Sequence, residues 1–223
     1  MRSILSDRLS SPPVAACLAI AGVVGGVLVG EGGLDTVVGC GMNSDYYPSQ
    51  TAKDWVDNAD HVVVATPIRE QDTNRRDFTE GPTHYTTDRL VTFRADDVLW
   101  SADRPKSPLG DNFDMVTDGW RAKRDSGRRL KRTTPEAPRL EPGHSYILAL
   151  RWAEDQWVVL GEGAAVPYDD NIAGQGEWCG RTLSKEDIAS AERFSRQDDN
   201  SLEKTVLGQD KQAVIRELKQ AGG

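Results

Sequence analysis

Histidine is scarce in this chain of 223 residues, and sequence motifs of catalysis are absent. The three histidines, His61, His84 and His144, do not lie at the spacing of a helical or Cys/His metal motif. Residues 143–147 resemble half of a nucleophile elbow, but Ile147 replaces its second glycine and a strand pattern follows. The sequence therefore predicts no metal site, no cofactor and no recognisable catalytic residue.

Charge is absent from the 22 residues between Arg8 and Glu31, and basic residues are absent between Arg8 and Lys53. At about 1.5 Å of rise per residue, the 17 most apolar residues form a rod of about 26 Å, close to the roughly 30 Å of a bilayer's hydrocarbon core. Flanking Lys and Arg residues stay in the cytoplasm. We therefore predict a cytoplasmic N-terminus over 1–12, a single transmembrane helix over 13–30, and an extracytoplasmic remainder.

Two other fates of the N-terminal region stay open. Residues 37–40, Val-Val-Gly-Cys, resemble a bacterial lipobox, in which Cys40 would carry the lipid. A cut at the small residues before Cys40 would instead release a secreted protein. The acidic stretch Glu31–Asp35 separates both sites from the apolar run, which favours an uncleaved anchor in the cell membrane.

Two cysteines outside the apolar run, Cys40 and Cys179, would lie in an oxidising compartment, where a disulfide can persist. A bridge between them would close about 140 residues and stabilise the fold by about 4–5 kcal/mol in the chain-entropy model. The alternative is two free thiols, and lipidation of Cys40 would exclude the bridge.

Small residues recur at four-residue spacing in the apolar run, at Gly22, Gly26 and Gly30. This small-xxx-small pattern lets two membrane helices approach closely and predicts a homodimer. The alternative is that these glycines reflect only the general abundance of glycine in membrane helices.

Strand patterns dominate residues 51–183, which follow a linker over 31–50. Apolar runs and alternation predict five strands, over 60–68, 85–100, 112–120, 145–152 and 156–160. Pro67 must lie at a bulge or an edge because it cannot donate to a ladder. The last two strands form a hairpin that is apolar on both faces and therefore central. Short turns between strands predict a mainly β domain, an OB-like barrel or a curled sheet.

Helical patterns mark two further segments. Thr51 and Asp54 form a capping-box pattern, which predicts a short helix over 51–58. Residues 184–223 carry apolar residues at helical spacing and predict C-terminal amphipathic helices, the last one capped by Asp210. We expect their apolar faces to pack on the sheet, with a partner's surface as the alternative.

Seven basic residues lie within twelve positions, opposed only by Asp125. They are Arg121, Lys123, Arg124, Arg128, Arg129, Lys131 and Arg132. In a chain of net charge −8, this basic cluster predicts a landing site for a cell-envelope polyanion or lipid headgroups. The alternative is a mobile, solvated loop. No aromatic residue is interleaved for stacking on bases, so we do not expect nucleic acid as a partner.

Three segments resemble a group of uncharacterised, membrane-anchored or secreted proteins of high-GC bacteria. They are Asp-Trp-Val at 54–56, Ala-Asp-His-Val-Val-Val-Ala-Thr at 59–66 and Leu-Glu-Pro-Gly-His-Ser-Tyr-Ile-Leu at 140–148. Such domains often look like OB or netrin-type barrels, so the resemblance implies a five-stranded barrel between about Trp55 and Leu160. Pro67 and the basic insertion after the third strand depart from that pattern. The resemblance implies no catalytic residues.

Three functional hypotheses follow. The first is a non-enzymatic, membrane-tethered extracytoplasmic domain that binds a cell-envelope component or a protein partner. The second is an envelope hydrolase that uses two converging carboxylates, with Asp60, Asp114, Asp118 and Glu177 as candidates. The third is an assembly subunit that dimerises through the glycine face of the membrane helix.

Overall fold

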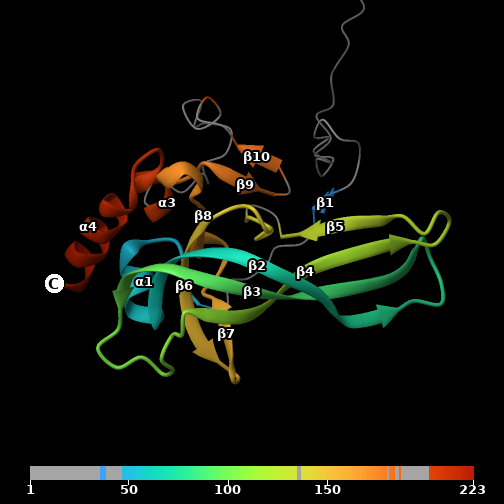
Figure 1. Cartoon of the computed structure of the whole chain (residues 1–223), viewed down its shortest axis with the longest axis horizontal. Helices are drawn as coiled ribbons and strands as arrows, with labels where there is room; N and C mark the ends of the chain where they lie inside the picture. Colours follow the sequence, from blue (N-terminus) through green and yellow to red (C-terminus); the bar gives the residue numbers. More distant parts are fainter. Residues whose placement is uncertain (1–35, 39–46, 135–136, 180, 184–185, 187–200) are drawn as a thin grey trace, which may run out of the picture.

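The computed structural model of the chain describes residues 36–38, 47–134, 137–179, 181–183, 186 and 201–223. These residues form a mainly β protein with a few helices (Figure 1). One sheet has the strand order β1-β5-β4-β3-β2-β6-β7, with β8 also paired to β6. The pairing is antiparallel throughout, apart from the parallel pair β1 and β5.

The strands of this sheet are β1 Thr36–Val38, β2 His61–Asp77, β3 Thr83–Ser101, β4 Asn112–Lys123, β5 Arg129–Thr133, β6 Tyr146–Ala153, β7 Gln156–Val159 and β8 Ala165–Pro167. A separate antiparallel pair is formed by β9 Gly176–Trp178 and β10 Arg181–Leu183. The helices are α1 Ala52–Asn58, α3 Leu202–Val206 and α4 Lys211–Gly222, with 3-10 turns η1 Glu162–Ala164 and η2 Asp169–Asn171.

The five strands predicted from the sequence correspond to β2, β3, β4, β6 and β7. The predicted number of five was wrong, because the described residues form a sheet of eight strands whose hydrogen-bonded neighbours make an open path from β1 to β7. Strand β5 was missed because it lies in the basic cluster, where Leu130 is the one apolar residue of Arg-Leu-Lys-Arg-Thr. Of the two predicted arrangements, the residues that the structure describes therefore form a curled sheet and not a closed barrel.

The long strand β2 changes its surroundings at Pro67. Before it, residues 61–65 pair with both β3 and β6. A register shift between Pro67 and Arg69 fits the predicted bulge, but the predicted strand end at Ile68 was wrong. From Ile68 to Asp77 the strand continues and pairs only with β3 among the described residues. This outer half forms part of a ribbon that extends away from the helices (Figure 1). Its many charged residues disfavour pairing with another strand at this exposed edge.

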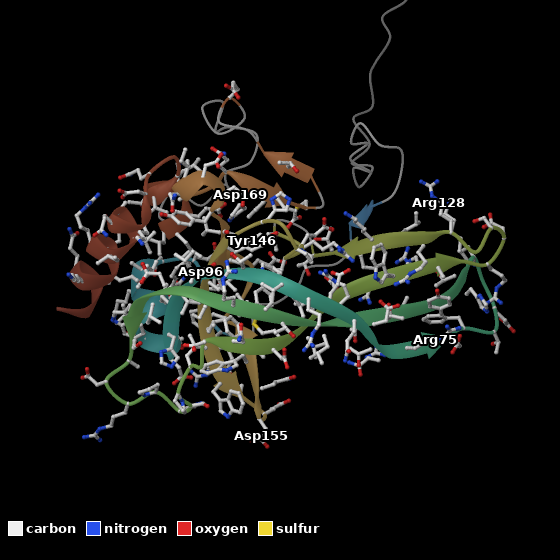
Figure 2. All side chains as sticks on the ribbon, in the orientation of Figure 1. Arg75, Asp96, Arg128, Tyr146, Asp155 and Asp169 are labelled. Atoms are coloured by element: carbon white, nitrogen blue, oxygen red, sulfur yellow. The ribbon has the colours of Figure 1, made fainter. Side chains whose placement is uncertain are left out.

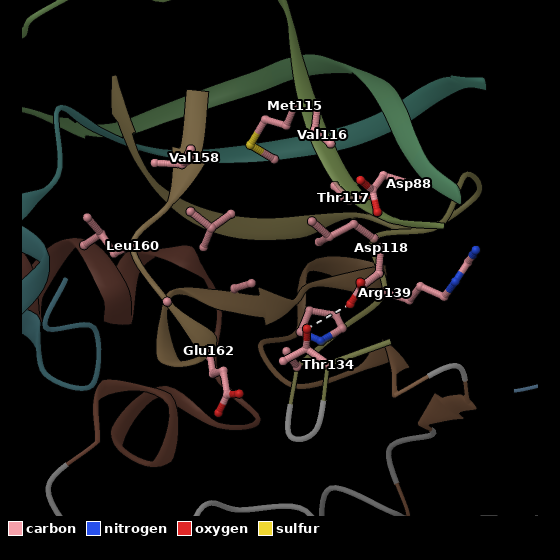
Figure 3. Close-up of a pocket in the computed structure, with 16 residues that line it drawn as sticks. Asp88, Met115, Val116, Thr117, Asp118, Thr134, Arg139, Val158, Leu160 and Glu162 are labelled. Carbon is pink, nitrogen blue, oxygen red and sulfur yellow. Dashed lines mark hydrogen bonds between the residues drawn. The ribbon is translucent and has the colours of Figure 1, made fainter. Parts of the chain in front are cut away.

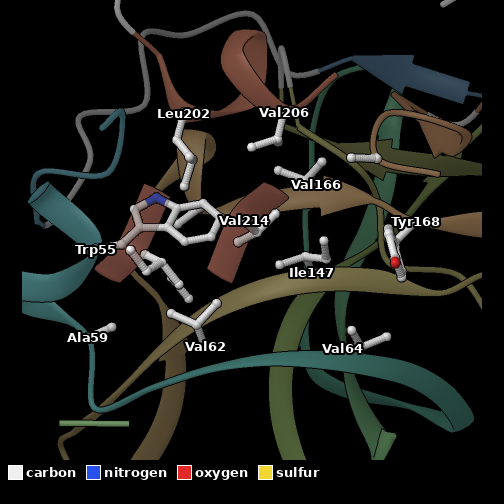
Figure 4. Close-up of a cluster of buried hydrophobic side chains, with 14 of the residues drawn as sticks. Trp55, Ala59, Val62, Val64, Ile147, Val166, Tyr168, Leu202, Val206 and Val214 are labelled. Atoms are coloured by element: carbon white, nitrogen blue, oxygen red, sulfur yellow. The ribbon is translucent and has the colours of Figure 1, made fainter. Parts of the chain in front are cut away.

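One face of the sheet is covered by helices α1, α3 and α4 (Figure 4). Trp55 of α1 is fully buried among Val62, Ile147 and Val214, and its indole Nε1 donates to the Ser49 carbonyl over 2.7 Å. The predicted capping box at the start of α1 is present. The prediction that the C-terminal helices pack on the sheet is confirmed for α3 and α4, whereas the helix predicted after Ser184 lies largely outside the described residues.

The other face carries a second apolar cluster. Val63 and Val91 are fully buried there, and Phe93 stacks on Phe113 with ring centroids 5.2 Å apart. Neighbouring residues of β2 alternate between the two clusters, with Val62 and Val63 on opposite faces. Burial on both faces explains why β2 and β6 have continuous apolar sequences.

No helix among the described residues is long and apolar enough to cross a membrane. The predicted anchor over 13–30, with Gly22, Gly26 and Gly30, lies outside the described residues, as does Cys40. The anchor, the homodimer and the lipoprotein alternative therefore stay predictions.

Candidate binding pocket between strands β4 and β7

A pocket of about 400 Å³ lies between β4 and β7 (Figure 3). Its walls are largely apolar and include Met115, Val116, Val158, Leu140 and Leu160. This volume falls in the range of typical small-molecule sites, which are mostly apolar with a few placed polar groups. The pocket was not predicted from the sequence.

In a closed barrel, β4 and β7 would pair with each other and complete the ring of strands. The pocket lies between these two strands. Within the described residues, β4 pairs with β3 over 112–123 and, on its other edge, with β5 only over 120–122. Strand β7 pairs with β6 alone. The sheet curls so that β4 and β7 approach each other without hydrogen-bonding, and residues 137–140 and 160–165 line the space that is left.

One end of the pocket is polar. Asp88 and Asp118 both line it and both contact Arg132, with Nη1–Oδ1 and Nη2–Oδ1 distances of 3.1 Å each. Thr134 Oγ1 donates to Asp118 Oδ2 over 2.9 Å, the dashed line in Figure 3. A Cβ at Gly119 would lie 2.4 Å from a backbone oxygen of β3, so only glycine permits the local approach of β3 and β4 beside these carboxylates.

Two buried arginines lie behind the polar end. Arg89 is fully buried, pairs with Glu70 Oε2 at 2.5 Å and donates from Nε to the Asp118 carbonyl over 2.7 Å. Arg139 is 3% exposed and contacts Glu141 Oε1 at 2.7 Å. Burial lowers the pKa of Arg139, helped by the positive charge of Arg89 and opposed by Glu141.

The Arg139 guanidinium is also held by backbone and aromatic groups. Nε donates to the Arg132 carbonyl and Nη2 to the Gly119 carbonyl, both over 2.9 Å. The guanidinium carbon lies 4.6 Å from the centroid of the Trp120 ring. Buried guanidinium groups are stable only when their donors are satisfied in this way. This side chain therefore anchors the pocket wall.

A buried carboxylate fixes the same wall from the other side. Glu177 is 2% exposed and accepts from the Arg139 backbone N–H over 2.8 Å, the Leu140 N–H over 3.1 Å and the Tyr146 hydroxyl over 2.9 Å. Leu140 has a left-handed φ of +61°, which costs free energy in a non-glycine residue. Burial raises the pKa of Tyr146, and the charge of Glu177 adds to this effect.

The His144 side chain forms a separate pair with a carboxylate. Its Nδ1 lies 2.6 Å from Asp169 Oδ2, and this hydrogen bond raises the pKa of His144. Asp169 Oδ1 also accepts from the Ser145 N–H over 2.8 Å. The Ser145 hydroxyl lies 3.0 Å from Thr66 Oγ1, so Ser145 is not paired with the imidazole as a nucleophile with its base. Neither His144 nor Asp169 lines the pocket.

The four carboxylates named for hydrolysis do not meet in the pocket, because only Asp118 lines it. Asp60 is buried and accepts from the backbone N–H groups of Lys106 and Trp152, each over 2.8 Å. Asp114 is exposed on β4, and Glu177 is engaged in the wall. The pocket's other carboxylates, Asp88 and Glu162, were missed because nothing in the local sequence separates them from exposed acidic residues.

The basic cluster lies largely on strands β4 and β5 rather than in a long loop. Arg124 donates to the Gly81 and Thr83 carbonyls over 2.9 and 3.0 Å. Arg129 pairs with Asp72 at 2.7 Å.

Two other members of the cluster, Lys131 and Arg132, also have carboxylate partners. Lys131 contacts Glu141 at 2.7 Å, and Arg132 contacts both pocket carboxylates. Arg121, Lys123 and Arg128 complete the cluster and lie near the end of the β4–β5 hairpin, with exposed Arg128 labelled in Figure 2. Ion pairs within the protein thus neutralise a large part of the positive charge of the basic cluster, which the sequence predicted to bind a polyanion.

Cys179 is 7% exposed, and its Sγ lies 4.0 Å from the Thr134 carbonyl oxygen. Its predicted partner, Cys40, lies outside the described residues, so the disulfide stays a prediction.

No protein family, no curated protein and no solved structure matches this chain significantly.

Proposed function

We propose that this chain is a membrane-tethered, extracytoplasmic binding domain that holds a small, partly apolar ligand between β4 and β7. The observation that carries the proposal is the pocket of about 400 Å³, whose walls belong to the folded sheet. Support for the tether comes from the uncharged apolar run over 13–30.

The rigidity of the walls favours binding. Buried Arg139 and Glu177 hold residues 139–141 by direct hydrogen bonds, so the pocket is shaped before a ligand arrives. A preformed site loses little conformational entropy on binding.

The polar groups of the pocket favour binding over hydrolysis. Asp88 and Asp118 are held together by one guanidinium, and Asp118 also accepts from Thr134. Glycoside hydrolysis instead needs one carboxylic acid and one carboxylate placed on either side of a scissile bond.

The test uses the full chain in phosphatidylcholine nanodiscs, with methionine methyl groups labelled with ¹³C. Met115 lines the pocket, whereas the other two methionines, Met1 and Met42, lie in the N-terminal region. We expect 1-octanol to shift the Met115 methyl resonance saturably and to leave the other two unchanged. Met115→Leu assigns the resonance.

Matched variants locate the binding. Val159 lines the pocket and is half-buried, so Val159→Trp should fill the space and abolish the shift. Val98→Trp is the control, because Val98 is 50% exposed on β3 and does not line the pocket. Failure of octanol and of its charged analogues to shift Met115 in the folded protein would overturn the proposal.

A second proposed function is binding of a cell-envelope polyanion by the β4–β5 hairpin. Arg121 and Lys123 carry the argument, because their side chains make no ion pair with the described residues and lie on β4 near the hairpin's end. Such binding would weaken with added salt.

A further inference from the structure

We propose that the ligand of this pocket is an amphiphilic cation, an apolar chain or ring that carries a protonated amine. This inference rests on the proposed binding function and deepens it by assigning the chemical class of the ligand. The apolar body would lie against Met115, Leu140 and Leu160, and the ammonium group would lie at the polar end beside Asp88 and Asp118.

The balance of charge at the polar end favours a cation. Asp88 and Asp118 contribute two carboxylates, and Arg132 is the single basic side chain that contacts both. The two aspartates are 22% and 28% exposed, so they are reachable from the pocket but partly shielded from bulk water. Glu162 and Arg139 also line the pocket, so these three carboxylates and two guanidinium groups carry a net charge of −1. A ligand ammonium group would balance it.

The basic residue that lines the pocket, Arg139, is held by other partners and is not placed to bind an anion. Arg139 uses its guanidinium donors on Glu141, the Arg132 carbonyl and the Gly119 carbonyl, and its flat face lies against Trp120. In Figure 3 its guanidinium extends away from the apolar lining. A carboxylate or phosphate ligand would therefore meet the two aspartates without gaining a cationic partner.

A hydroxyl group in the lining adds a further contact. Thr117 lines the pocket, and its Oγ1 is buried without a hydrogen-bond partner among the described residues. A buried polar atom of this kind is costly unless a donor or acceptor reaches it. An ammonium group has three N–H donors, which suit two carboxylates and one hydroxyl oxygen.

The experiment compares three octyl compounds on the same protein in phosphatidylcholine nanodiscs at pH 7. Octylammonium, 1-octanol and octanoate share the apolar chain and differ in the charge of the head. We expect octylammonium to bind about tenfold more tightly than 1-octanol, as judged by the Met115 methyl shift, and octanoate to bind more weakly than either. Added salt should reduce the preference for the ammonium compound.

Charge-neutralising variants test the assignment. Asp88→Asn and Asp118→Asn should each reduce the preference for octylammonium over 1-octanol several-fold. Asp114→Asn is the matched control, because Asp114 is an exposed carboxylate on β4 that does not line the pocket. It should keep the wild-type preference.

The outcomes separate the two proposals. Saturable binding of 1-octanol without a preference for octylammonium, or with a preference for octanoate, would overturn the cation assignment and leave the binding function standing. An unchanged preference in both Asp88→Asn and Asp118→Asn would do the same. No Met115 shift with any of the three compounds would overturn both.

Discussion

Removal of one hydroxyl group should reveal how much the pocket wall depends on its buried hydrogen bonds. Tyr146 is fully buried, and its hydroxyl accepts from the Glu141 backbone N–H and donates to Glu177, each over 2.9 Å. Tyr146→Phe removes both hydrogen bonds and keeps the ring packed in the core. The Glu141 N–H and one lone pair of Glu177 lose their partner.

The expected cost follows from these two losses. A hydrogen bond to a charged carboxylate contributes about 1.5–3 kcal/mol, and a buried N–H without a partner costs about 1–3 kcal/mol. The two effects share one hydroxyl group and are not additive, so we expect the free energy of unfolding to fall by about 2–4 kcal/mol. For a chain of this size, that corresponds to a Tm lower by about 5–15 °C.

The assay is urea-induced unfolding of the full chain in nanodiscs, followed by tryptophan fluorescence. All six tryptophans lie between Trp55 and Trp178, so the signal reports the β domain. Tyr85→Phe is the control, because the Tyr85 ring contacts Arg75 at 3.9 Å through its face, a contact that phenylalanine keeps. The reasoning is refuted if Tyr146→Phe lies within about 0.5 kcal/mol of Tyr85→Phe.

Three further predictions concern other parts of the fold. The raised pKa of His144 implies a contribution to stability that is full below the ordinary histidine pKa of about 6.5 and is lost as pH rises through the folded-state value. In urea unfolding, the stability difference between wild type and His144→Asn should therefore shrink from pH 6 to pH 9. A constant difference would contradict the Asp169 hydrogen bond as its source. Gly119→Ala should lower the free energy of unfolding by about 1–3 kcal/mol, because its Cβ would overlap a backbone oxygen of β3; wild-type stability would show that the strands can move apart. Arg121→Gln combined with Lys123→Gln should weaken polyphosphate binding in a salt-dependent way, and equal binding by this variant would remove the hairpin as a polyanion site.

Local and periodic signals in the sequence were sufficient for much of the fold. The capping pattern at Thr51 and Asp54 determines where α1 begins, and Asp210 caps α4 through the Gln212 N–H. These interactions connect near neighbours, so they can be read from a few residues. The continuous apolar sequence of residues 61–65 similarly reflects burial on both faces of β2.

The candidate site could not be predicted in the same way. Its lining comes from β3, β4, β7 and the segment 137–140, which are brought together only by the curl of the sheet. The burial of Arg89 and Glu177 could not be predicted, because charged residues are usually exposed and their burial here depends on distant partners. The ion pairs of the basic cluster could not be predicted for the same reason, since the carboxylates that pair with Arg129 and Arg132 come from other strands.

The buried arginines also hold backbone carbonyls of β4 beside the pocket. If β4 paired with β7, backbone N–H and C=O groups at the edge of β4 would form hydrogen bonds with β7. Near that edge, the Asp118 carbonyl accepts from Arg89 and the Gly119 carbonyl accepts from Arg139. These carbonyls are satisfied without a partner strand, as buried backbone acceptors must be. The two arginine side chains thus satisfy β4 carbonyls beside two residues of the pocket lining, Asp118 and Arg139.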